Sequence, residues 1–251
     1  MRWPAVLGSI WLWLPLLILA AVLTRVSLLG APLVDDEFFH LLVGKNWWLD
    51  QELAMLDGIY TRGALFTKLV AYSFASFGDV SPAASRIFPS LVTAVATIVL
   101  MFWWVRREVG AVAAFAFAFF YLFWPDGIEV AQFARFYALH GLFFTLGIIL
   151  FYYAVTSDQT PLWWRTILAA GAGGSILVAL QLQILTVATL VGVGAWFGVL
   201  YVLPWLFRQE KRVVAGLSAL AVIGLAVGAA LFREKVAALW SVYRTLPPGW
   251  D

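Results

Sequence analysis

The sequence predicts an all-α fold, a polytopic membrane helical bundle, and three observations support this prediction. Of the 251 residues, 63% are hydrophobic and 12% are charged, and the mean hydropathy is +0.92. Soluble globular proteins contain about 45–50% apolar and about 25% charged residues. Fourteen Trp, eight Tyr and twenty Phe fit aromatic side chains that anchor helices at both faces of a bilayer.

The charge and the rare residue types exclude several classes of function. The formal net charge of +2 is too small an excess to indicate nucleic acid as a partner. The chain has no cysteine, which excludes disulfide bonds, thiolate metal sites and a cysteine nucleophile. Only two histidines are present, so an all-histidine metal site is impossible.

The apolar runs between charges predict about seven transmembrane helices, because a bilayer core about 30 Å thick requires about 20 mostly apolar helical residues. These helices are expected at residues 7–29, 87–105, 111–124, 136–155, 166–180, 184–207 and 213–232. We expect one membrane domain over residues 1–251. It has an extracytoplasmic loop at 30–85, the remaining spans within 86–232 and an extracytoplasmic tail at 233–251.

Two segments of the first loop are predicted as interfacial helices. Residues 36–56 mix large apolar side chains with acids, as amphipathic surface helices do. Residues 63–78 are nearly long enough to span but contain Lys68. If they spanned, the basic residues of the later loops would face outward, against the positive-inside rule. We therefore expect a multi-pass protein of the plasma (inner) membrane with a cytoplasmic N-terminus.

Three adjacent carboxylates, Asp35, Asp36 and Glu37, follow the first apolar run. Membrane proteins seldom place acids there without a use. An aspartate that starts a helix can cap it, and we interpret Asp35 in this way. Asp36 or Glu37 is then the candidate general base, or a ligand of a divalent cation if one binds. His40 shares their helical face, where it either contacts substrate or has no function.

A second polar cluster lies at the start of the fourth predicted span. It consists of Glu129, Gln132, Arg135, Phe136, Tyr137 and His140. Arg135 either extends to lipid phosphates in general or binds one phosphate through two parallel hydrogen bonds. Arg62, Lys68 and Arg86 are weaker phosphate candidates. A bound phosphate beside external carboxylates indicates chemistry on a phosphate-linked lipid.

Four short motifs follow one another in the first 155 residues. They are Val-Asp-Asp-Glu-Phe-Phe-His at 34–40, Ser-Arg-Ile-Phe-Pro-Ser at 85–90, a loop containing Pro125, and Ala-Arg-Phe-Tyr-Ala-Leu at 134–139. In order, spacing and membrane side they resemble C-type (GT-C) glycosyltransferases. The nearest branch uses dolichyl- or undecaprenyl-phosphate sugars and includes protein mannosyltransferases and lipid A aminoarabinose transferases.

This resemblance implies a glycosyltransferase with its site on the extracytoplasmic side. The family's catalytic acidic pair falls on Asp36 and Glu37, or includes Asp35 if the register shifts by one, and its arginine falls on Arg135. The donor would be a polyprenyl-phosphate sugar, and the acceptor a protein, glycolipid or polysaccharide. Members usually contain more spans, so the chain resembles their seven-span N-terminal core. It is then a truncated enzyme, a fragment, or a short form that needs a partner subunit.

Two other interpretations remain open at this stage. One is a non-catalytic subunit that binds polyprenyl lipids, or a transporter. The other is a scaffold, or an inactive core, whose external charges only cap helices. The sequence contains no internal repeat of the kind common in transporters.

Overall fold

The structure is a computed structural model, and it describes residues 10–27, 29–34, 37–55, 58–60, 63–157, 160–183 and 186–207. These residues are largely helical, which confirms the all-α class. The chain divides into two compact units, residues 1–188 and 189–251, and each is described separately. The predicted last span at 213–232 and the tail at 233–251 lie outside the described residues.

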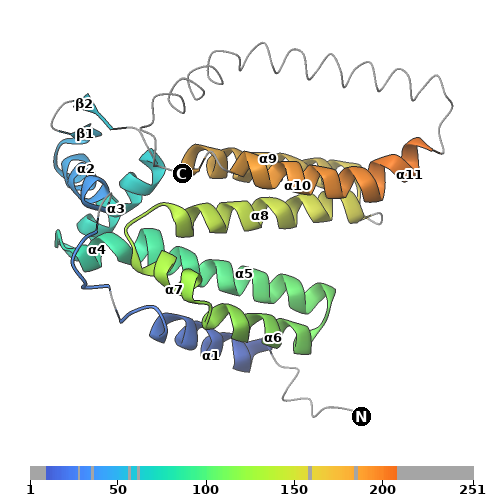
Figure 1. The fold of residues 1–251 in the computed structure, drawn as a ribbon, viewed down its shortest axis with the longest axis horizontal. Coiled ribbons are helices and arrows are strands. Elements are labelled where there is room, and N and C mark those ends of the chain that lie inside the picture. The colour runs from blue at the N-terminus through green and yellow to red at the C-terminus, as the bar shows by residue number, and fades with distance from the viewer. Residues whose placement is uncertain are drawn as a thin grey trace, which may run out of the picture. The chain divides into compact units, whose positions relative to one another are not determined.

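The first unit contains nearly all of the described elements (Figure 1). In chain order they are α1 (Ile10–Leu23), α2 (Glu37–Asp50), β1 (Ala54–Met55), β2 (Gly58–Ile59), α3 (Ala64–Phe77), α4 (Pro82–Arg86), the π-helical segment η2 (Ile87–Val92), α5 (Thr93–Glu108), α6 (Ala111–Leu122), α7 (Pro125–Gln132), α8 (Tyr137–Thr156) and α9 (Leu162–Leu182). Helix α10 (Thr186–Phe197) crosses the boundary between the units, and η3 (Gly198–Val202) and α11 (Leu203–Leu206) belong to the second.

Several of these helices are long and apolar enough to cross a membrane, as an integral membrane protein requires. Within the described residues three helices qualify, namely Pro82–Glu108, Tyr137–Thr156 and Leu162–Leu182. They match the predicted second, fourth and fifth spans. The apolar helices Trp13–Leu23 and Thr186–Val202 are shorter than a span needs. The described residues thus contain three or four candidate spans, and the predicted total of seven is not shown.

The fourth candidate is a bent pair, and here the sequence interpretation was wrong. Residues 125–132, expected as a loop, form α7, which is bent by 61° from α6. Pro125 lies at the first helical positions, where its missing N–H leaves no hydrogen bond unmade. Gly127, Ala131 and Gln132 are buried, so packing stabilises this short helix. The span is therefore broken or re-entrant.

Helix α4, segment η2 and helix α5 form one long helix of 27 residues. It begins at Ser81, whose side chain accepts a hydrogen bond from the Ala84 N–H, and Pro82 occupies the first turn. Pro89 lies inside η2 and has no N–H to donate. The π-helical segment accommodates that missing hydrogen bond without ending the helix.

Helices α2 and α3 pack together at one end of the first unit, beside α4, in blue and cyan in Figure 1. Each has 14 residues, too short for a span of about 20 residues. Helix α3 ends at Gly78, whose φ of 64° permits its N–H to donate to the Phe74 carbonyl. Both predicted surface helices therefore exist, although their location at a membrane interface stays a prediction.

The contact between α2 and α3 requires a glycine. A Cβ atom at Gly44 would lie 2.7 Å from Val70 Cγ1 and 3.4 Å from the Thr67 carbonyl oxygen. Val70 is fully buried, and a valine side chain has few alternative rotamers. The two helix backbones can approach this closely only because residue 44 has no side chain.

We therefore expect Gly44→Ala to lower the free energy of unfolding by about 1 kcal/mol or more, because overpacking a buried contact is destabilising. Thermal unfolding of the purified protein measures this change. Gly173→Ala in α9 is the matched control, since a Cβ there meets no atom within 4 Å. Adding Val70→Ala should restore part of the loss. Equal stability of the Gly44 and Gly173 variants would contradict the close contact.

Candidate functional site

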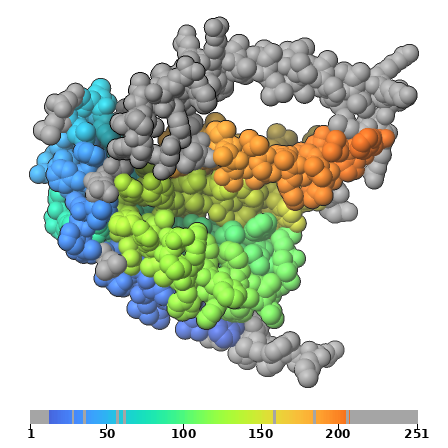
Figure 2. All heavy atoms as spheres, viewed as in Figure 1, coloured from blue at the N-terminus to red at the C-terminus, as the bar shows by residue number. Residues whose placement is uncertain are grey.

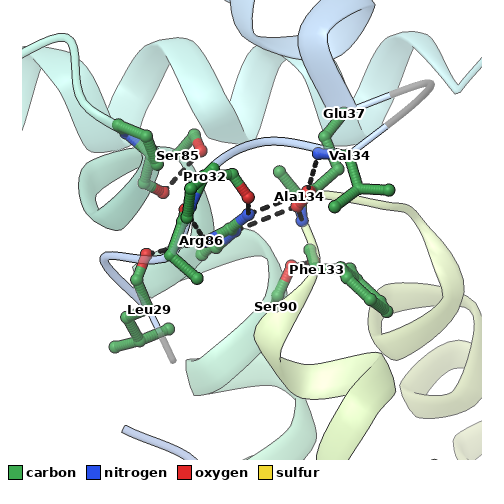
Figure 3. Close-up of polar contacts among 11 residues, drawn as sticks. Leu29, Pro32, Val34, Glu37, Ser85, Arg86, Ser90, Phe133 and Ala134 are labelled. Carbon is green, nitrogen blue, oxygen red and sulfur yellow. Dashed lines mark hydrogen bonds and ion pairs between the residues drawn. The ribbon is translucent and has the colours of Figure 1, made fainter. Parts of the chain in front are cut away.

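Glu37, the last acid of the triplet, is completely buried at the start of α2. Its partner is Arg86 at the end of α4, with 2.8 Å between Glu37 Oε2 and an Arg86 terminal nitrogen. Both side chains are about 1% exposed. The two residues are 49 positions apart in the sequence, and together they join the first loop to the long α4–α5 helix (Figure 3).

The Arg86 guanidinium donates five hydrogen bonds within the protein. Nε donates to Glu37 Oε1 at 2.9 Å, and Nη2 donates to Glu37 Oε2 and to the Pro32 carbonyl. Nη1 donates to the Leu29 and Ala31 carbonyls at 2.9 and 2.8 Å. A guanidinium has five N–H groups, so these bonds use its full capacity. These contacts indicate a structural role for Arg86, and phosphate binding by Arg86 stays a prediction.

The hydrogen-bond acceptor positions of the Glu37 carboxylate are also all occupied. Oε1 accepts from Arg86 Nε and from the Ala134 N–H, and Oε2 accepts from Arg86 Nη2 and from the Val34 N–H. A carboxylate offers about four lone-pair positions, and all are occupied here. Glu37 therefore has no free position for a proton or a cation. These contacts indicate a structural role for Glu37 as a buried acceptor, and its predicted role as a reagent or metal ligand stays a prediction.

The hydrogen bond from the Ala134 N–H to Glu37 brings the two predicted clusters together. Arg135 follows Ala134 directly, and Asp36 precedes Glu37 directly. The Ser90 hydroxyl donates to the Phe133 carbonyl, which attaches the same segment to η2. Figure 3 shows these contacts around the segment before α8. The structure thus brings together Glu37 and Ala134, the sequence neighbours of the predicted base Asp36 and the predicted phosphate ligand Arg135.

His40 lies on the same buried face of α2 as Glu37, as the spacing predicted. It is 1% exposed, and its Nδ1 lies 3.1 Å from the Thr67 hydroxyl. The rings of Phe66 and Phe136 meet it edge-on, at centroid distances of 5.0 and 5.9 Å. These contacts indicate a packing role between α2, α3 and the start of α8. Substrate contact by His40 stays a prediction.

Arg135 and Tyr137 lie where α8 begins. The Arg135 guanidinium is half-buried and lies 5.8 Å from the centre of the Tyr137 ring. This distance suits a cation–π contact, which orients the guanidinium. Phe136, between them in sequence, points inward and is 3% exposed. The cation predicted to bind phosphate is thus positioned by a buried neighbour and an aromatic ring.

The other members of the second cluster separate in space. Glu129 is exposed on α7, whereas Gln132 is buried and donates to the Arg25 carbonyl and the Ser27 hydroxyl. His140 Nε2 lies 2.7 Å from the Thr186 hydroxyl, which joins α8 to the start of α10. Lys68, a phosphate candidate outside this cluster, is exposed on α3, with Nζ 4.2 Å from the Trp47 ring centre. None of these contacts indicates phosphate binding.

Three predicted site residues, Asp35, Asp36 and Arg62, lie outside the described residues. Their assigned roles as cap, base and phosphate ligand stay predictions. Within the described residues, no group of three or more acids and histidines could hold a metal ion. Binding of a divalent cation by Asp36 and Glu37 stays a prediction.

The sequence analysis did not single out Arg25, which with Arg86 is one of the two most deeply buried basic residues in the described part of the chain. It is 0% exposed and donates to the Tyr121 and Leu122 carbonyls at 3.1 and 3.4 Å. These carbonyls end α6, where a cation complements the helix dipole. Together with the Gln132 contact, this fixes the bend between α6 and α7. An arginine inside a predicted span is itself a signal of a specific role.

Comparisons with known proteins identify no relative. No family model matches the chain, and neither the curated proteins nor the solved structures contain a match.

We expect Glu37→Gln to lower the free energy of unfolding by about 3–5 kcal/mol, because it leaves the buried Arg86 charge without its counterion. Thermal unfolding in detergent measures the loss. Glu129→Gln, at an exposed position, is the control and should be neutral. An unchanged melting temperature for Glu37→Gln would contradict the buried pair.

Proposed function

We propose that the protein transfers a sugar from a polyprenyl-phosphate donor to an acceptor hydroxyl on the extracytoplasmic side of the plasma membrane. One observation carries this proposal: the hydrogen bond between Glu37 and the Ala134 N–H. It joins the acidic triplet to the segment that bears Arg135. A carboxylate and a phosphate-binding cation are the two groups that such a transfer needs.

The reaction requires little help at the leaving group, because a sugar attached to phosphate already departs as a stabilised anion. In our proposal Asp36 accepts the proton of the acceptor hydroxyl. The hydroxyl oxygen then bonds to the anomeric carbon, and the bond from that carbon to the phosphate oxygen breaks. The electron pair leaves with the polyprenyl phosphate, whose growing charge Arg135 stabilises.

The buried Glu37–Arg86 pair supports this division of roles. Arg86 balances the Glu37 charge internally, so neither side chain needs to contact a ligand. Val34 and Glu37 are joined by two hydrogen bonds, one from the Glu37 N–H to the Val34 carbonyl and one from the Val34 N–H to the Glu37 side chain. Asp35 and Asp36 are the two residues between these fixed positions in the sequence. We assign Glu37 as a positioning residue.

The distribution of basic residues supports the proposed orientation. Arg106 and Arg107 lie in the last turn of α5, and Arg165 donates to the Ala154 carbonyl near the end of α8. Helix α8 has 20 residues, so this end lies about 30 Å from the start of α8 and the Glu37 network. Basic residues at helix ends favour the cytoplasmic side. The Glu37 end would then face outward.

The test is sugar transfer by the purified chain, assayed with radiolabelled polyprenyl-phosphate sugars and a panel of acceptors. We expect Asp36→Asn to reduce the rate about 10²-fold or more, as loss of a general base does, without unfolding the protein. Asp50→Asn, an exposed acid at the end of α2, is the matched control and should retain full activity. Near-normal turnover by Asp36→Asn would refute the assignment of the base. No transfer by a folded wild-type chain would favour a lipid-binding subunit.

Arg135→Lys should raise the donor KM and lower kcat, because lysine keeps the charge but cannot form two parallel hydrogen bonds to phosphate. Steady-state kinetics with varied donor concentration measures both constants. Arg107→Lys, at the opposite end of the bundle, is the control and should change neither. Unchanged donor kinetics in Arg135→Lys would remove Arg135 from the site.

A further inference from the structure

Aromatic and charged side chains gather where the end of α5 meets the end of α8. The two helices pack side by side (Figure 1). The hydroxyl groups of Tyr152 and Tyr153, on α8, donate to the two carboxylate oxygens of Glu108, on α5, at 3.0 and 2.7 Å. These two hydrogen bonds fix the last turn of α5 against the last turn of α8.

Arg107, the residue before Glu108, contacts two aromatic rings. Its guanidinium carbon lies 5.7 Å from the centre of the Trp103 ring and 4.8 Å from the centre of the Tyr153 ring. The two rings lie 6.3 Å apart, with 60° between their planes. Both Arg107 distances suit cation–π contacts. The side chain is therefore oriented by the protein itself, which lowers the entropic cost of binding a ligand.

The Arg107 charge is only weakly balanced by its neighbour Glu108. The ion pair between them joins Arg107 Nε to Glu108 Oε1 at 3.8 Å, which is longer than a hydrogen bond. Both Glu108 oxygens accept hydrogen bonds from tyrosines, and the Arg107 side chain is 60% exposed. Exposed ion pairs of this kind contribute little energy. An oriented positive charge thus faces the surroundings at this end of the bundle.

The surroundings of Arg107 suit the headgroup level of a bilayer. Trp163 and Trp164, at the start of α9, are exposed, and Arg165 beside them donates to a carbonyl near the end of α8. Tryptophan and tyrosine side chains concentrate at this level of membrane proteins. Helix α6, in green in Figure 2, follows α5 directly and exposes the apolar side chains of Val112 and Phe119. Basic and aromatic residues therefore adjoin a surface that suits lipid chains.

From these contacts we propose that the joined ends of α5 and α8 bind the headgroup of an anionic phospholipid, with Arg107 as the ligand of its phosphate. A guanidinium can donate two parallel hydrogen bonds to phosphate oxygens. Arg106, in the same turn, and Arg165 add positive charge. A lipid of net negative charge is favoured over a zwitterionic one, because the ammonium group of the latter would lie in the same positive field.

This site is distinct from the one proposed for sugar transfer. Helix α8 has 20 residues, so about 30 Å separates Tyr153 at its end from Arg135 before its start. In the orientation proposed above, the bound lipid belongs to the cytoplasmic leaflet. Its headgroup does not overlap the proposed donor phosphate.

Native mass spectrometry of the purified full chain in detergent tests this inference, because it measures how many lipids bind at each lipid concentration. The probe is phosphatidylglycerol, and phosphatidylcholine is the comparison. The wild type should bind phosphatidylglycerol about fivefold more tightly or better. Arg107→Gln should weaken phosphatidylglycerol binding about fivefold, the contribution of one basic residue near a membrane surface. Lys45→Gln, which removes a charge from an exposed position on α2, is the control and should bind like the wild type.

Glu108→Gln provides a second test, in the opposite direction. It removes the negative charge 3.8 Å from Arg107, while its amide oxygen can still accept a tyrosine hydrogen bond. Phosphatidylglycerol binding should strengthen about twofold, a gain that a folding defect cannot produce. Equal affinity of the wild type for the two lipids would overturn the headgroup site. Equal phosphatidylglycerol affinity in the wild type and Arg107→Gln, or an equal loss in Arg107→Gln and Lys45→Gln, would also overturn it.

Discussion

The rest of the site depends on one buried ion pair, between Glu37 and Arg86. Both side chains are about 1% exposed, and removing two charges from water is costly unless every polar position finds a partner. Here four acceptor positions and five donors are all used. Because every donor and acceptor of the two buried side chains needs a hydrogen-bond partner, backbone groups of residues 29–34 and of Ala134 point toward the Glu37–Arg86 pair. The pair specifies how three distant segments meet, more than it adds stability.

This constraint changes the interpretation of the acidic triplet. Glu37 is a fixed internal acceptor, which leaves Asp36 as the candidate base and Asp35 as the candidate cap. Because Glu37 contacts the Ala134 N–H, the start of α2 and the segment before α8 lie together. The proposed transfer needs a carboxylate and a phosphate-binding cation at one site.

Hydropathy predicted the long helices well, because a run of about 20 apolar residues has few alternatives in a bilayer. It placed Tyr137–Thr156 and Leu162–Leu182 within a few residues. It did not predict α7, where Pro125 starts a short helix after a bend, since local composition resembles a loop. Nor could it pair Glu37 with Arg86, because their contact depends on the packing of segments 49 residues apart. Arg25 was overlooked although its position within an apolar run was a usable signal.

The Glu37–Arg86 pair holds Glu37, the last acid of the triplet, against the segment before α8. Because the chain has no cysteine, a single pair of introduced thiols at positions 36 and 135 can be cross-linked without background. Asp36→Cys with Arg135→Cys should react rapidly with a short thiol-specific cross-linker in the folded protein. Adding Glu37→Gln should slow that reaction strongly. Efficient cross-linking that Glu37→Gln leaves unchanged, or no cross-linking in the folded double variant, would contradict the account.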